Sequence, residues 1–162
     1  MLPGEGPQPC LGMVIAEAPS LADEKTGALL TGVAGRVLDS ALRSLGVTRR
    51  QFYITTLVKN TPLDSDGRQR RPYDVEAEAW KGILEQEIQS TAPRAILALG
   101  RTVAKTLTGL EGEIPYGSKI GNVYIAWHPA YVARGAGQEF YDIPPVELWL
   151  EQLAPFVREV EA

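Results

Sequence analysis

Four short apolar runs, separated by longer segments that include stretches with helical spacing of apolar residues, constrain the fold of this 162-residue chain more than any other feature. Each run is short enough to be a buried strand. Strands that alternate with helices form parallel sheets covered on both faces. We therefore expect an α/β fold, a three-layer α/β/α arrangement around a central four-stranded, mostly parallel sheet, with residues 1–162 forming one domain. The runs are residues 11–16, 52–58, 95–99 and 123–126.

Two segments between the runs carry clear helical signals. Apolar residues recur at helical spacing between Val33 and Leu45, and Gly46 is expected to end that helix. Asp74 is expected to cap a second helix. The apolar spacing predicts that its buried face consists of Val75, Ala79, Trp80, Ile83, Leu84 and Ile88.

Other segments lack such a period. Residues 21–31 and 60–72 are expected to be loops, and loops as long as the second are often functional. The last helix is expected to begin near Pro145. It should be kinked or split at Pro155, because proline lacks the N–H group that a helix interior uses.

The distribution of charge bears on possible partners. A formal net charge of −4 argues against a protein that its overall field holds on nucleic acid. Between Arg49 and Arg71, however, there are six basic residues and only two acids. Such a cluster is most often a solvated surface, but it is also typical of a small anion-binding site. The basic residues are Arg49, Arg50, Lys59, Arg68, Arg70 and Arg71.

Cysteine usage and hydropathy indicate the cellular setting. The only cysteine, Cys10, excludes an intramolecular disulfide and a four-cysteine metal site, and a single histidine argues against zinc. No cofactor is expected, and the protein should fold without iron or zinc. No apolar run approaches the ~20 residues of a membrane span, and residues 1–10 do not look like a signal peptide. We expect a monomer in a reducing cytoplasm, with no membrane partner.

Residues that could take part in catalysis or binding occur where the predicted strands end. Glu17, Thr56, Gly100-Arg101 and His128 each close or follow an apolar run. In a parallel sheet these ends share one edge, where open α/β sheets place their ligand sites. A carboxylate and an imidazole there can position water and stabilise developing charge. The alternatives are a histidine that only fills a strand end and a glutamate that pairs with a lysine or caps a helix.

Four blocks of residues occur in an order and spacing specific to one superfamily. They are I-A-E-A-P-S at residues 15–20 with T-G at 26–27 and G-V-A-G at 32–35, Y-I-T-T-L-V-K at 53–59, A-L-G-R-T at 98–102, and H-P-A-Y at 128–131. Together they resemble the family 4 uracil-DNA glycosylases. The corresponding motifs of that family are G-E-A-P-G with T-G-x-P-F-x-G-x-A-G, Y-I-T-N-x-x-K, A-L-G-x-T and H-P-x-Y.

The chain departs from that family at several functional positions. Family members carry four cysteines that hold an iron–sulfur cluster, whereas Asn60 stands where one of them belongs and only Cys10 exists here. Thr56 replaces the asparagine that reads uracil, and its single hydroxyl lacks the donor–acceptor fork of an amide. Leu30 replaces the phenylalanine that stacks on the flipped base, and leucine has no π-face. Ala16 replaces a glycine.

The resemblance implies a uracil-DNA glycosylase-like fold and an enzyme that flips a base out of DNA and hydrolyses its N-glycosidic bond. Glu17 would orient the attacking water, and His128 would donate a hydrogen bond to the leaving base. The implied base pocket consists of Ala16, Ala18, Leu30 and Thr56. The expected DNA contacts, including the basic loop, are Pro19, Ser20, Lys59, Arg68, Arg70, Arg71, Gly100, Arg101, Pro129, Ala130, Val132 and Arg134.

The two changes at Thr56 and Leu30 leave the substrate open. One interpretation is excision of uracil or of a related modified base, such as a modified pyrimidine. Another is a weak glycosylase that acts only on single strands. The alternatives from other classes are a catalytically silent DNA-binding relative and a domain that binds a small nucleotide.

Overall fold

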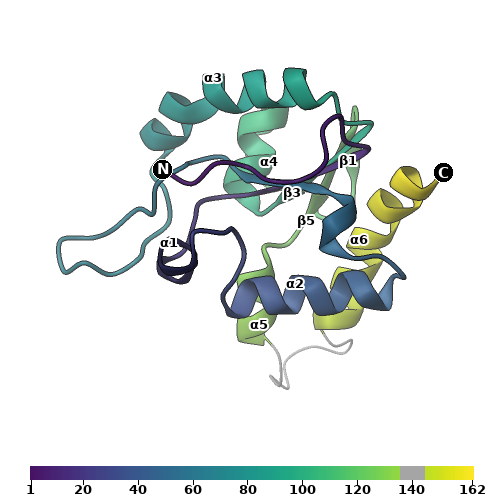
Figure 1. Ribbon diagram of the computed structural model, residues 1–162, viewed down its shortest axis with the longest axis horizontal. Helices are drawn as coiled ribbons and strands as arrows, with labels where there is room; N and C mark the ends of the chain where they lie inside the picture. Colours follow the sequence, from purple (N-terminus) through teal and green to yellow (C-terminus); the bar gives the residue numbers. More distant parts are fainter. Residues whose placement is uncertain (136–144) are drawn as a thin grey trace.

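The computed structural model describes residues 1–135 and 145–162. Its centre is a five-stranded sheet in the order β2-β1-β3-β5-β4 (Figure 1). β1 pairs in parallel with β2 and β3, β3 pairs in parallel with β5, and β4 runs antiparallel to β5. The predicted α/β class with a mostly parallel sheet is therefore confirmed. The strands are β1 (Gly12–Ala16), β2 (Tyr53–Thr56), β3 (Ala95–Leu99), β4 (Lys119–Ile120) and β5 (Val123–Ala126).

Helices cover both faces of the sheet, as the three-layer prediction requires (Figure 1). Alternate residues of β1 enter two separate cores, one containing Val14 and Ala16 and the other Met13 and Ile15. Because both faces of the strand are buried, it reads as an unbroken apolar run in the sequence. The first core is covered by α2 (Val33–Ser44), α5 (Pro129–Gly135) and α6 (Pro145–Glu161), and the second by α3 (Asp74–Thr91) and α4 (Arg101–Thr108).

Two details of the predicted secondary structure are wrong. Residues 21–31 contain a helix, α1 (Leu21–Thr26), where the sequence predicts only a loop. The Ser20 hydroxyl accepts a hydrogen bond from Asp23 N while the Asp23 carboxylate accepts one from Ser20 N, and this capping box stabilises a short helix without an apolar period. The sheet also has a fifth strand, the edge strand β4. The sequence does not predict it, because two residues are too few to show alternation.

The predicted buried face of α3 is only partly right. Trp80, Leu84 and Ile88 do pack inward. Val75 and Ile83, however, are 73% and 46% exposed, and Ala79 is also exposed. Apolar residues occur on both sides of this helix, so their spacing alone does not select the side that packs. The fully buried residues of the helix are Ala77, Leu84 and Thr91.

α3 differs from expectation in its capping residue, whereas α6 begins at Pro145 as predicted but differs at Pro155. α3 begins at Asp74 itself, with Tyr73 as its N-cap residue. α6 continues through Pro155 and is not split. Trp149 and Phe156, on either side of the proline, are fully buried, so apolar packing offsets the hydrogen bond that proline cannot donate.

Candidate active site

Three strand ends bring Glu17, Gly100 and His128 together at the carboxyl edge of the sheet. Glu17 directly follows β1, Gly100 directly follows β3, and His128 lies two residues beyond β5. Parallel pairing keeps these ends level, since Leu99 pairs with Ala126. The strand ends therefore meet where open α/β sheets place their ligand sites.

Gly100 allows the carboxylate and the imidazole to lie close to each other. Its φ of 97° lies in a region that side chains of L-residues rarely adopt. A Cβ at this position would lie 3.1 Å from Glu17 Oε1 and 3.4 Å from His128 Cβ. Gly100 N donates a hydrogen bond to Ala126 O at 2.9 Å, which holds this turn against β5. Glu17 and His128 are therefore separated by little more than a glycine backbone.

The surroundings of His128 favour a neutral ring with its proton on Nε2. Nδ1 accepts a hydrogen bond from Ala130 N at 3.0 Å, so this nitrogen carries no proton. Burial lowers the pKa of His128; the charge of Glu17 opposes that shift, and the charges of Arg134 and Arg71 reinforce it. At neutral pH the ring therefore offers an Nε2–H donor without carrying a charge.

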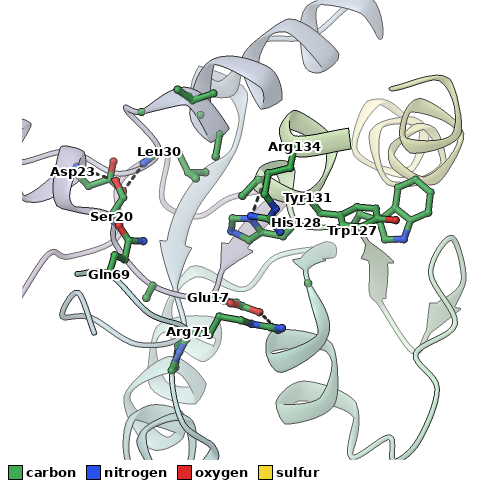
Figure 2. A pocket seen from close by; sticks show the side chains of 18 of the residues that line it. Glu17, Ser20, Asp23, Leu30, Gln69, Arg71, Trp127, His128, Tyr131 and Arg134 are labelled. Atoms are coloured by element: carbon green, nitrogen blue, oxygen red, sulfur yellow. Dashed lines mark hydrogen bonds and ion pairs between the residues drawn. The ribbon is translucent and has the colours of Figure 1, made fainter. Parts of the chain in front are cut away.

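Glu17 is held by both its backbone and its side chain. Its carbonyl oxygen accepts a hydrogen bond from Val58 N at 2.9 Å, beyond the end of β2. Its side chain is 12% exposed and pairs with Arg71 Nη2 at 3.1 Å. Arg71 belongs to the segment 60–72, so this basic segment reaches across the sheet edge to the carboxylate (Figure 2).

Glu17 and His128 line one pocket of about 770 Å³. In Figure 2 the imidazole lies on one side of the pocket, Ser20 and Leu30 lie on the other, and Glu17 lies between them next to Arg71. Pockets of this size accommodate small ligands. The predicted site residues that line the pocket are Glu17, Ala18, Ser20, Leu30, Arg70, Arg71, Gly100, Arg101, His128, Ala130 and Arg134.

Comparison with known proteins places the chain in a family. The family model described as the Uracil DNA glycosylase superfamily matches residues 3–149. The chain belongs to the uracil-DNA glycosylase superfamily. A type-4 uracil-DNA glycosylase of Pyrobaculum aerophilum is 35% identical over 147 residues, which cover 82% of this chain and 73% of that protein. A type-4 enzyme of Thermotoga maritima is 29% identical over 146 residues, which cover 84% and 73%. The resemblance to family 4 is thereby confirmed.

Asp23 and Arg49, which are not among the predicted site residues, hold residues 29–31 of this uracil-DNA glycosylase relative, where Leu30 lines the pocket. The Asp23 carboxylate accepts hydrogen bonds from Leu30 N at 3.1 Å and Thr31 N at 2.9 Å. Burial alone would raise the pKa of Asp23, but the hydrogen bonds that it accepts lower the pKa overall. Arg49 donates to Leu29 O at 2.9 Å and to Leu30 O at 2.6 Å.

A local signal exists for only one of these two residues. The S-x-x-D pattern at residues 20–23 is a capping-box signature and points to Asp23. Arg49 binds carbonyl groups 19 and 20 positions away in the sequence, so only the folded chain reveals its role.

Two of the four predicted base-pocket residues do not line the pocket. Ala18 and Leu30 do, whereas Ala16 and Thr56 do not. Ala16 is fully buried and Thr56 is 1% exposed, because they are the last residues of β1 and β2 and both faces of these strands are covered. The Thr56 hydroxyl has no hydrogen-bond partner among the residues that the structure describes.

Lys59, an expected DNA contact, is buried. Its side chain is only 4% exposed, and Nζ lies 2.7 Å from Glu87 Oε1. Nζ also donates to Thr55 Oγ1 at 2.7 Å. Burial lowers the pKa of Lys59, and the attraction of Glu87 opposes that shift. α3 covers this end of β2, so the ammonium group lies inside the protein.

Val132, an expected DNA contact, is not exposed in the fold. The residues after His128 form α5 from Pro129 onward. This helix turns Val132 into the core, where it is fully buried. The neighbouring Tyr131 is 38% exposed and lines the pocket instead.

The backbone amides of Ser20 and Ala130, two of the expected DNA contacts, already have partners within the protein. Ser20 N donates to Asp23 Oδ2 at 3.1 Å, and Ala130 N donates to His128 Nδ1. Pro19 and Pro129 have no N–H and are buried. The amides at these two turns therefore position Asp23 and His128. Among the predicted arginines, Arg68 is exposed but does not line the pocket.

The segment 60–72 is held by an arginine clamp. Arg70 pairs with Glu76 at 2.6 Å, and its guanidinium lies 3.9 Å from the centre of the Tyr73 ring.

Within residues 1–135 and 145–162, no three His, Cys, Asp or Glu side chains group together as a metal site would require. Folding without iron stays a prediction. None of the described helices is long and apolar enough to cross a membrane.

Proposed function

We propose that this protein is a DNA glycosylase that excises uracil, or a related modified base, from DNA. The observation that carries the proposal is a neutral imidazole donor and a carboxylate on either side of Gly100 in one pocket. Membership of the uracil-DNA glycosylase superfamily and the names of the type-4 relatives support it. We also propose that the enzyme is a monomer and acts in the cytoplasm.

The proposed reaction replaces the bond between C1′ of the sugar and the base nitrogen with a bond to water. The electron pair of the C1′–N bond goes to the base, which leaves as an anion. His128 Nε2–H donates a hydrogen bond to the base oxygen on which the charge collects. The Glu17 carboxylate orients the water and offsets positive charge on the sugar. The water gives its hydroxyl to C1′, and its proton returns to the base.

The pocket residues suggest how the nucleotide is held. Ala18 and Leu30 offer apolar contact to the base, and Leu30 lies across the pocket from His128 (Figure 2). Phosphate groups would be bound by cations in or near the pocket. These cations are Arg68, Arg70, Arg71, Arg101 and Arg134.

Excision assays with two variants test the proposal. Glu17→Gln and His128→Ala should each lower kcat by about 10²-fold or more, because a preorganised donor is worth on the order of 10²–10³ in rate. Affinity for DNA should stay nearly unchanged, because both groups act mainly in the transition state. The substrates are single-stranded and duplex oligonucleotides with uracil, hydroxymethyluracil or hypoxanthine.

Two outcomes would count against the proposal. Variants as active as the wild type would remove Glu17 and His128 from the mechanism. A wild-type protein that binds these oligonucleotides but releases no base would favour the catalytically silent DNA-binding relative.

A further inference from the structure

Three aromatic side chains lie next to one another in the pocket that contains His128, and we call this group the aromatic shelf. It consists of Tyr116, Trp127 and Tyr131, all of which line the pocket. The Trp127 ring centre lies 6.3 Å from that of Tyr116 and 5.2 Å from that of Tyr131. The rings are tilted by 52° and 57°, so none stacks face to face on its neighbour. Tyr116 and Tyr131 are 36% and 38% exposed.

The shelf is fixed to the rest of the protein through its backbone. Trp127 N donates to Gln152 Oε1 at 2.9 Å, and Trp127 O accepts from Trp149 Nε1 at 3.0 Å. Both partners belong to α6. Tyr131 N donates to His128 O at 3.0 Å, and Gly117 N, next to Tyr116, donates to Ile125 O at 2.7 Å. The backbone that carries the three rings is therefore held in place before any ligand binds.

Positive charge lies next to the shelf. Arg71, Arg101 and Arg134 line the same pocket, although the chain as a whole carries a net charge of −4. Burial raises the pKa of Tyr116, and the charges of Arg71 and Arg101 oppose that rise. This ring is therefore within electrostatic reach of both guanidinium groups. Ring faces beside cations match a strand of bases joined by phosphates.

We propose that the aromatic shelf binds nucleobases of unpaired DNA next to the nucleotide that enters the pocket, so that the protein prefers single-stranded to duplex DNA. The inference rests on the proposed function for the pocket itself. In a duplex the bases are stacked on one another and their faces are covered. In a single strand the bases next to the reacting nucleotide can turn and stack on protein rings.

Binding measurements on DNA without uracil test the shelf separately from catalysis. One labelled oligonucleotide is used as a single strand and as a duplex, and affinity is followed by fluorescence anisotropy. Tyr131→Leu and Tyr116→Leu should each weaken single-strand binding by roughly 5- to 150-fold, the effect of losing one stacked base. Duplex affinity should hardly change. The salt dependence of binding should also stay the same, because no charge is removed.

Two further variants control the interpretation. Tyr131→Phe keeps the ring and should retain single-strand affinity. Ile83→Ala removes apolar surface at a residue of α3 that is 46% exposed and does not line the pocket, and it should also bind like the wild type. Circular dichroism and thermal midpoints verify that each variant is folded.

Three results would overturn the proposal: leucine variants that bind the single strand normally, equal losses on single strand and duplex, or a matching loss in Ile83→Ala. Failure of the proposed function is a different result. In that case the wild type releases no uracil, while the tyrosine variants still bind single strands more weakly.

Discussion

His128 is the only histidine in the chain, so a single imidazole signal reports on the centre of the site. Its tautomer is set by Ala130 N, and its pKa is lowered first by burial. Glu17 and Arg71 act on this pKa in opposite directions, although they pair with each other. Single substitutions of Glu17 and Arg71 can therefore separate the effects of these two charges on the pKa of His128.

We expect the His128 signal, followed by NMR, to titrate below the usual value of about 6.5. Glu17→Gln should lower this pKa further, because it removes the charge that stabilises the imidazolium. Arg71→Ala should raise it, because it removes a repelling cation. A wild-type pKa at or above 6.5, or shifts of the same sign in both variants, would contradict this electrostatic account.

The same shift makes stability depend on pH in a defined direction. Because the folded state holds the His128 pKa down, the unfolded chain binds a proton at higher pH than the folded protein. The contribution of His128 to stability is complete above about pH 6.5 and is lost as pH falls towards the folded pKa. Urea titrations between pH 5 and 8 should show this loss in the wild type and a smaller one in His128→Ala.

The turn between β3 and α4 links backbone conformation to the chemistry of the site. α4 begins after Gly100 and ends before Gly109, and both glycines have positive φ, 97° and 74°. Of these two glycines, only Gly100 is a position where an added Cβ would approach other atoms, those of Glu17 and His128. The two ends of one helix therefore offer a matched pair of substitutions.

Gly100→Ala should reduce kcat/KM for base excision by tenfold or more, because the new methyl group pushes Glu17 away from its position beside His128. Displacements of about 1 Å can cost on the order of 10²-fold in rate. Gly109→Ala also places a methyl group at positive φ but meets nothing within 4 Å, so it should affect the thermal midpoint more than the rate. Equal loss of activity in both variants would show that backbone strain, and not contact with the site, is the cause.

Across the whole molecule, a net charge of −4 and a basic segment have to be reconciled. Burial shows which cations can act on DNA. Lys59 is enclosed with Glu87, whereas Arg68 is exposed and the Arg71 side chain is 68% exposed. We infer that the arginines of the segment 60–72, without the lysine before it, supply the salt-dependent part of DNA affinity.

Arg68→Gln and Arg71→Gln should each lower the slope of log K against log salt by about 0.7–0.9, the value for one lost phosphate contact. Lys59→Met should leave that slope unchanged. It should instead lower the free energy of unfolding by about 3–5 kcal/mol, because it leaves the Glu87 carboxylate without its buried partner. Affinities at several salt concentrations, together with urea unfolding, separate the two effects. An unaltered slope after neutralising both arginines would mean that the segment does not touch DNA.

Much of this molecule follows from local sequence. The apolar runs predict the four longer strands, because a strand buried on both faces shows no polar alternation. Glu17, Gly100 and His128 are predicted to meet because each follows such a run, and parallel strands end at one edge. The capping pattern at Ser20 could have revealed α1 as well, since capping is also a local interaction.

Tertiary structure alone decides which side of an element is buried and which charges find partners. No residue near Lys59 in the sequence indicates that it pairs with Glu87. Likewise, no residue near Val132 indicates that α5 turns this side chain inward and leaves Tyr131 at the pocket. The aromatic shelf likewise joins rings from two segments that lie next to each other at β5. Periodicity and motifs report interactions between near neighbours in the chain, whereas burial and ion pairing depend on residues that only folding brings together.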